Sequence, residues 1–185
     1  FYFGLPALFF VVGLWVLMPW FIRLGMLPYY AYLLGLGLPL VLLLLLSVLW
    51  LRLEGREITW DTLKARFRLH PMDRKAWLWS VGALLLGSVF GYGGMSLLSS
   101  LMIRQGIFPI PTTVPAFMNP TSLTDPMTAY NEAVGGLRGN WLPFVAISIL
   151  LVFNILGEEF WWRGVVLPRQ ELAFGKWAWV VHGVM

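Results

Sequence analysis

The chain has 185 residues, of which 59% are hydrophobic and only 12% are charged. Because a soluble domain carries about 25% charged residues, this composition excludes a water-soluble globule, and the apolar content excludes a disordered chain. There is no cysteine, which excludes disulfides, thiolate metal sites and a cysteine nucleophile. The net charge of +4 is interpreted by its position around membrane spans, and no nucleic-acid partner is expected.

Four apolar stretches are long enough to cross a lipid bilayer, whose core needs about 20 helical residues. The predicted spans are Tyr2–Ile22, Pro28–Leu51, Ala76–Ile103 and Trp141–Trp162, and a fifth apolar run (177–185) starts near Trp177. Helices satisfy their own backbone in lipid, and no strand alternation typical of a barrel is visible. We therefore predict an all-α polytopic transmembrane helix bundle, with residues 1–185 forming a single membrane-embedded domain. Since both ends fall inside apolar runs, we expect a fragment truncated at both ends.

Basic residues are concentrated in two of the segments between the spans. Arg52–Lys75 carries seven basic against four acidic residues, and Arg163–Lys176 carries three against one, whereas residues 104–140 are neutral. The positive-inside rule places both basic segments in the cytoplasm, so the first span runs outward and the fourth runs inward. We expect a multi-pass protein of the plasma (inner) membrane.

Two connecting segments have a character of their own. Within Ile58–Leu69, apolar residues recur at helical spacing between basic ones, which favours a short helix lying on an anionic membrane surface over an ordinary solvated loop. Ile107–Pro126 contains five prolines and is expected to be an extended, irregular loop on the outer face.

Two adjacent carboxylates, Glu158 and Glu159, lie at the end of the fourth predicted span. An acid near the centre of a membrane helix costs about 2.5–3.5 kcal/mol, so such residues normally face a cavity or a partner. Glu159 and Arg163 are spaced i,i+4 and can form an ion pair. Glu158 lies on a different face, shared with Asn154, and is free to face a polar cavity. A carboxylate there is suited to activating a water. The competing interpretation is that both acids are interfacial residues paired with nearby bases.

His182 lies in the fifth apolar run, where a histidine is a functional candidate. Its imidazole could bind the same water, donate to an oxyanion or ligate a metal. Taken alone, it would more often be a core histidine bonded to the backbone.

The pattern Glu-Glu-x-x-x-Arg, followed by a histidine on the next helix, resembles the CPBP (CAAX-protease and bacteriocin-processing, or Abi) family of intramembrane endopeptidases. The family's first motif is complete here, as Glu158, Glu159 and Arg163. The second, aromatic-x-x-x-His, is partial, because Ala178 stands where the aromatic residue is expected before His182. The family's third motif, His-x-x-x-Asn or Asp, lies further along the chain in the family, and it is not found up to Met185.

The resemblance implies hydrolysis of a peptide bond in a membrane-associated protein or peptide. Glu158 would be the general base, Glu159 and Arg163 would order the site, and His182 would bind the water or stabilise the oxyanion. The motif would lie at the cytoplasmic end of its helix. The resemblance implies a glutamate-driven reaction with no required cofactor, although two glutamates and a histidine could also hold a divalent metal such as zinc.

Two other functions remain open from the sequence. The chain could be a non-catalytic accessory or structural subunit of a larger membrane complex that retains the protease-like fold. It could also be a transporter with Glu158 as a proton carrier, although the inverted repeat typical of transporters is not visible.

Overall fold

The computed structural model describes residues 2–107, 115, 117 and 125–184. These residues form helices and connecting turns, and no strand occurs among them, which confirms the all-α prediction for this part of the chain. Contacts divide the chain into two compact units, residues 1–69 with 131–185 and residues 70–130. Each unit is described by itself below, and the single membrane-embedded domain stays a prediction.

The first two predicted spans form helices close to their expected bounds. The first consists of α1 (Gly4–Val12), the π-helical η1 (Gly13–Leu17) and α2 (Met18–Arg23), and the second is α3 (Pro28–Leu53). Both are long and apolar enough to cross a membrane. Gly25, with φ +88°, makes the turn between them, and Pro28 occupies the first turn of α3, where its missing N–H leaves no bond unmade.

The fourth predicted span is longer than the sequence indicated. α8 (Leu142–Glu159), the π-helical η4 (Phe160–Val166) and α9 (Leu167–Phe174) follow one another without a break, so the helix continues past the predicted end at Trp162. The extra residue of the π-helical turn precedes Pro168, which has no N–H to donate. Gly175, with φ +54°, ends the helix, and η5 (Gly175–Trp177) leads into α10 (Ala178–Val184) where the fifth run was expected.

The first basic segment contains the predicted short helix, as α4 (Trp60–Arg66), so the alternative of an ordinary loop is wrong. Thr59 caps this helix by accepting a hydrogen bond from the backbone of its first turn. Phe67, just after α4, is only 3% exposed and stacks on Phe160 at 3.9 Å between ring centroids. This side chain therefore anchors the segment to the η4 helix, while the location of α4 on a membrane surface stays a prediction.

The second unit holds the third predicted span. Residues 76–103 are helical throughout, as parts of α5 (Arg74–Val89), the π-helical η2 (Phe90–Met95) and α6 (Ser96–Arg104), and α7 (Pro126–Val134) begins in this unit. In the described residues three helices qualify as candidate spans, namely Gly4–Arg23, Pro28–Leu53 and Leu142–Gly183. The third predicted span is not among them, so a bundle with four full spans stays a prediction. Most of the predicted proline-rich loop lies outside the described residues.

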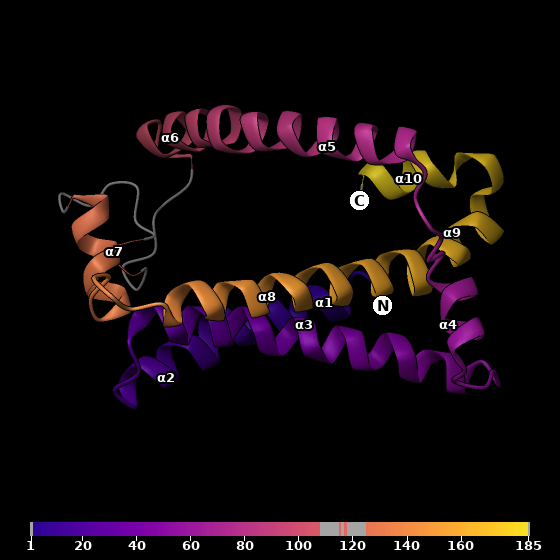
Figure 1. The fold of residues 1–185 in the computed structure, drawn as a ribbon, viewed down its shortest axis with the longest axis horizontal. Coiled ribbons are helices and arrows are strands. Elements are labelled where there is room, and N and C mark those ends of the chain that lie inside the picture. The colour runs from indigo at the N-terminus through magenta and orange to yellow at the C-terminus, as the bar shows by residue number, and fades with distance from the viewer. Residues whose placement is uncertain (1, 108–114, 116, 118–124, 185) are drawn as a thin grey trace. The chain divides into compact units, whose positions relative to one another are not determined.

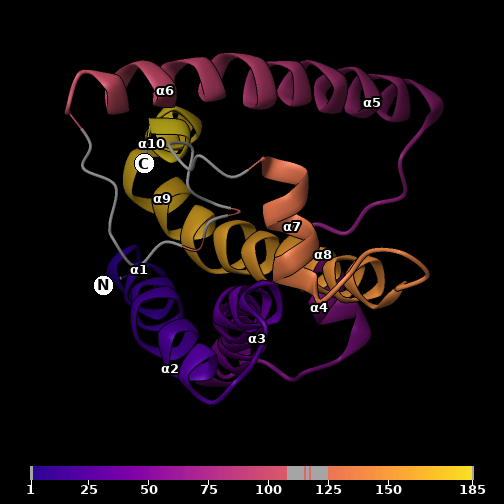
Figure 2. The same cartoon turned by 90° about the vertical axis from the view of Figure 1, so that its left-hand side faces the viewer.

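The helices α3 and α8 pack side by side and run in the same direction (Figures 1 and 2). Near their starts, the Tyr29 hydroxyl donates to the carbonyl of Pro143 at 3.2 Å. Further along, Gly157 lies against the backbone of Leu40, where an added Cβ would be only 2.4 Å from the carbonyl oxygen. Parallel packing is what the predicted alternation of spans requires, because the second and fourth spans both run inward.

A second close approach joins the first two helices in this unit. A Cβ on Gly13 would lie 2.0 Å from the carbonyl oxygen of Gly35, so the two backbones meet there directly. Pro39 lies four residues after Gly35 and cannot donate to that carbonyl. Small residues at such crossings are typical of helix association in membranes, where apolar burial supplies little driving force.

The core of the first unit lies where η4 meets the second half of α3. Leu43, Trp161, Val165 and Val166 are buried, with aromatic residues from the start of the chain packed against them. The indole Nε1 of Trp161 donates to the carbonyl of Tyr2 at 3.0 Å, across 159 positions of sequence. This contact ties the N-terminal helix to the segment that carries the Glu-Glu motif.

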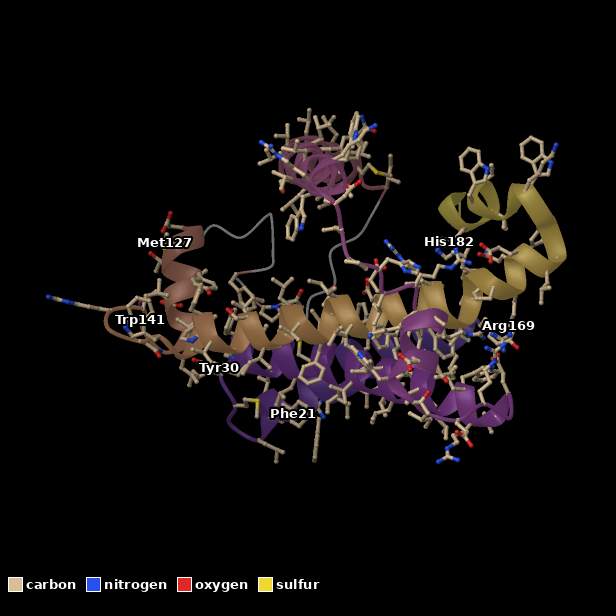
Figure 3. All side chains as sticks on the ribbon, turned by 45° about the vertical axis from the view of Figure 1, so that its right-hand side comes forward. Phe21, Tyr30, Met127, Trp141, Arg169 and His182 are labelled. Atoms are coloured by element: carbon tan, nitrogen blue, oxygen red, sulfur yellow. The ribbon has the colours of Figure 1, made fainter. Side chains whose placement is uncertain are left out.

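The two basic segments meet at one end of this unit. Arg68 donates to Glu171 at 2.6 and 2.8 Å, and Arg169 donates to Glu54 at 2.7 Å. Figure 3 shows Arg169 and His182 at the end of the unit opposite to Tyr30 and Trp141. The contact between the segments supports the prediction that both lie on the same side of the membrane.

Candidate active site

The Glu-Glu pair lies level with the middle of α3. Glu158 follows Gly157, which contacts Leu40, and Leu40 precedes the end of α3 at Leu53 by 13 residues. At 1.5 Å per residue, the pair is about 20 Å from that end of α3. The helix continues for 15 residues after Glu159, to Phe174. The motif was expected near the end of its helix because the span was predicted to stop at Trp162. Which side of a membrane this end faces stays a prediction.

Glu159 and Arg163 form the ion pair that their spacing predicts. The contact joins Arg163 Nε to Glu159 Oε2 one turn along the helix, although the helix is π-helical from Phe160 onward. The two side chains are 46% and 59% exposed on the isolated chain. Glu159 is therefore paired on a partly exposed face of its helix.

Glu158 has a different environment from that of its neighbour. Both acids are half-buried, but Glu158 forms no hydrogen bond or ion pair within the described part of the chain. Asn154, one turn earlier, is also half-buried. Helical spacing places the two acids on different faces, and their roles in a reaction stay predictions.

His182, on α10, is held by a residue that the sequence did not single out. Its Nδ1 lies 2.7 Å from the side-chain amide oxygen of Gln170 on α9, and Gln170 is only 6% exposed. An amide oxygen only accepts, so Nδ1 donates and the neutral imidazole keeps Nε2 as an acceptor. Gln170 lies in the second basic segment, where the sequence alone suggests a solvated polar side chain. The chain reverses at Gly175, and this reversal places His182 beside Gln170.

The aromatic neighbour of His182 comes from a different helix than the family motif implies. Ala178, at the position where the motif has an aromatic residue, is buried at 3% exposure. The ring of Trp162 instead packs edge-on to the imidazole, with 6.3 Å between centroids. Trp162 follows Glu158 by four residues, so His182 packs against the helix one turn beyond the acid. No hydrogen bond joins Glu158 to His182 among the described residues.

The described residues contain no group of three or more His, Cys, Asp or Glu side chains that could hold a metal ion. A metal bound by Glu158 and His182 would therefore need further ligands from outside this part of the chain.

No family model, curated protein or solved structure matches the chain. Function is therefore inferred from the residues and their geometry.

Proposed function

We propose that the chain is an intramembrane endopeptidase of the CPBP type, in which Glu158 activates water to hydrolyse a peptide bond of a membrane-associated protein or peptide. The observation that carries the proposal is the difference between two adjacent carboxylates. Both are half-buried, but Glu159 is paired with Arg163, whereas Glu158 has no hydrogen-bond partner in the described residues. A structural ion pair needs only one of these acids, and the second is available for chemistry.

The depth of Glu158 adds to this support. An acidic residue costs about 2.5–3.5 kcal/mol at the centre of a membrane helix and less toward its ends. Glu158 lies beside the middle of α3, a helix long and apolar enough to cross a membrane. Acidic residues near the centre of a membrane helix usually line an ion or substrate pathway or take part in a reaction. An acid that only pairs with surface bases would lie at the membrane interface instead.

The proposed reaction assigns one role to each group. Glu158 takes a proton from a water, the hydroxide adds to the carbonyl carbon of the substrate, and Glu158 returns the proton to the leaving amine. His182 Nε2, left as an acceptor by the bond to Gln170, holds the other hydrogen of that water. Glu159 and Arg163, paired with each other, order the site beside Glu158.

The membrane arrangement completes the proposal. The second unit supplies a further full span, the chain belongs to the plasma (inner) membrane, and the end where the two basic segments meet faces the cytoplasm. The contacts of Arg169 with Glu54 and of Arg68 with Glu171 support a common side for both segments. The positive-inside rule makes that side cytoplasmic.

The test uses the full chain in liposomes with two fluorogenic probes, a farnesylated CAAX peptide and a single-span peptide. Glu158→Gln should lower cleavage at least 100-fold, because a general base contributes about 10²–10⁴ in rate. Its unfolding midpoint in SDS should stay at the wild-type value. The matched control is Glu171→Gln, an equal loss of charge further along the same helical run, which should cleave normally. Equal cleavage by the two variants would show that Glu158 is not the base.

The absence of a direct bond between Glu158 and His182 among the described residues favours one alternative, a non-catalytic subunit of a larger membrane complex. Such a subunit would co-purify with its partners in fixed stoichiometry, and the Glu158→Gln variant would assemble normally. A chain that cleaves either probe when purified alone would exclude this alternative.

A further inference from the structure

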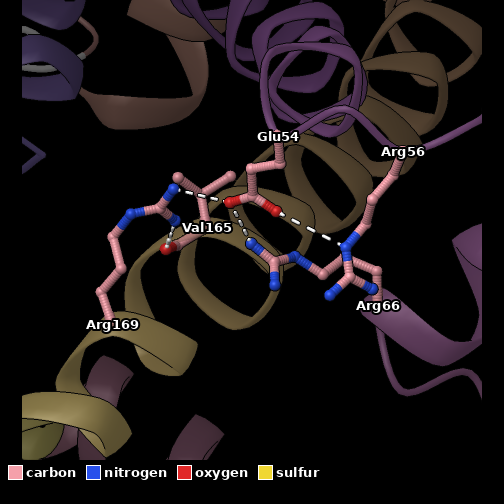
Figure 4. Close-up of polar contacts among 5 residues, drawn as sticks. All are labelled: Glu54, Arg56, Arg66, Val165 and Arg169. Atoms are coloured by element: carbon pink, nitrogen blue, oxygen red, sulfur yellow. Dashed lines mark hydrogen bonds and ion pairs between the residues drawn. The ribbon is translucent and has the colours of Figure 1, made fainter.

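A cluster of three arginines surrounds one carboxylate at the end of α3 (Figure 4). Glu54 Oε1 accepts hydrogen bonds from Arg66 Nη2 at 2.6 Å and from Arg169 Nη2 at 2.7 Å. Arg56 Nε lies 4.0 Å from Glu54 Oε2. Arg169 also donates to the carbonyl of Val165 in the preceding turn. These residues come from the end of α3, from α4 and from α9, so the fold assembles the cluster from three places in the sequence.

The charges in this cluster do not balance. Three guanidinium groups face one carboxylate, which leaves an excess of two positive charges. The cations are also partly withdrawn from water, since the side chains of Arg66 and Arg169 are 14% and 26% exposed. Burial lowers the pKa of Arg66, and Glu54 opposes that effect. Partly desolvated cations without enough counter-charge are unfavourable, so the cluster favours binding of an anion.

The cluster lines a cavity of about 360 Å³ with both charged and apolar walls. The charged wall consists of Glu54 and the three arginines, and the apolar wall of Pro168 and Leu172. Leu172 is 89% exposed on the isolated chain, which indicates that an apolar surface is available beside the charges. Guanidinium groups offer planar, forked donors that match phosphate oxygens.

The cationic wall is also held in place. The guanidinium of Arg169 lies over the rings of Tyr2 and Trp50, at 4.9 and 5.1 Å from their centroids. Trp50 is in the last turn of α3 and packs against the buried core. The cavity lies at the end of this candidate span, beside the basic segment that follows it, which is the level expected for lipid headgroups.

We propose that this cavity binds the phosphate group of an anionic phospholipid, whose glycerol and first acyl carbons lie along Pro168 and Leu172. A soluble anion would satisfy the charges but would leave the apolar wall uncovered. A zwitterionic lipid would bring its own cation toward three arginines. The proposal does not depend on hydrolase activity, because Glu158 and His182 do not line the cavity.

The test measures lipid-dependent thermal stabilisation of the full chain in a neutral detergent. The probes are dioctanoyl phosphatidylglycerol, dioctanoyl phosphatidylcholine and inorganic phosphate. Phosphatidylglycerol should raise the Tm of the wild-type chain in a saturable way, because a ligand of the folded state stabilises it. Phosphatidylcholine and phosphate at the same concentrations should have little effect.

Arg56→Gln removes the most exposed of the three cations, with side-chain exposure of 56%. It should weaken phosphatidylglycerol binding about five-fold, as expected from roughly 1 kcal/mol per arginine at an anionic surface. The matched control is Arg52→Gln, an equal loss of charge four residues earlier in the last turn of α3 that does not line the cavity, and it should bind like the wild type. If both variants weaken phosphatidylglycerol binding equally, the effect comes from the overall surface charge and not from this cavity, and the proposal is overturned. An equal response to phosphate or to phosphatidylcholine would also overturn it.

Discussion

Gly157→Ala tests the register of α3 against α8, on which the depth of Glu158 depends. The added Cβ would lie 2.4 Å from the carbonyl oxygen of Leu40 and 3.1 Å from its carbonyl carbon, whereas ordinary contact begins near 3.4 Å. These are backbone atoms of a helix and cannot turn aside as a flexible side chain can. The two helices must therefore separate by about 1 Å at this point.

The cost follows from the weaker packing along that interface. A gap of 0.5–1 Å removes a quarter to a half of the dispersion attraction between facing atoms, and inserting a methyl group into a tight core typically costs about 1–3 kcal/mol. Alanine is the better helix former by nearly 1 kcal/mol, which offsets only part of that loss. We expect Gly157→Ala to lower the free energy of unfolding by up to about 2 kcal/mol.

The assay is equilibrium unfolding of the full chain in mixed micelles of a neutral detergent and SDS. The matched control is Gly82→Ala in α5, where an added Cβ meets no described atom within 4 Å. This control should be neutral or slightly stabilising. A Gly157→Ala chain that unfolds at the same SDS fraction as Gly82→Ala would show that the helices do not meet there, and the mid-depth position of Glu158 would lose its support.

Two further substitutions test other contacts of the first unit by the same unfolding assay. Trp161→Phe removes the donor to the Tyr2 carbonyl and part of a fully buried side chain, and it should cost about 1–3 kcal/mol; no change would mean that the N-terminal helix does not dock there. The exposed pair of Arg68 and Glu171, at 44% and 42% exposure, should contribute at most about 1 kcal/mol in a double-mutant cycle with glutamine, and less in high salt. A coupling well above that value would mean that the pair is shielded from water.

Local pattern was sufficient to predict several parts of this structure. The first two spans follow from apolar runs bounded by turn residues near Gly25 and Gly55, both of which have positive φ. The ion pair of Glu159 with Arg163 follows from helical spacing alone. The spans and the ion pair depend only on residues that are neighbours in the sequence, so no long-range contact is needed to predict them.

Long-range contacts explain what the sequence did not predict. The Glu-Glu pair was assigned to the end of a helix because the fourth span was predicted to stop at Trp162. In the structure Trp161 is a core residue, fully buried against α3 and the start of the chain. The partner of His182, Gln170, depends on the reversal at Gly175, and no periodicity places those two side chains together.

The order Gly-Glu-Glu divides the α8–η4 helix into three faces. Successive residues on a helix are about 100° apart, and residues four apart lie close to one face. The three pairs are Gly157 with Trp161, Glu158 with Trp162, and Glu159 with Arg163. The first pair packs against α3 and the core, the second includes the ring that contacts His182, and the third is the exposed ion pair.

This division explains why Glu158 can stay unpaired beside a charged neighbour. The close approach at Gly157 fixes the rotation of the helix about its axis, so Glu158 cannot turn toward the backbone of α3 without breaking that contact. The ion pair of Glu159 with Arg163 lies within one helix, so it occupies the neighbouring carboxylate but does not restrain this rotation. If Glu158 is the proposed base, Gly157→Ala should therefore lower the cleavage rate even under conditions where the variant is fully folded. The reason is that the added methyl group releases the contact that orients the acid.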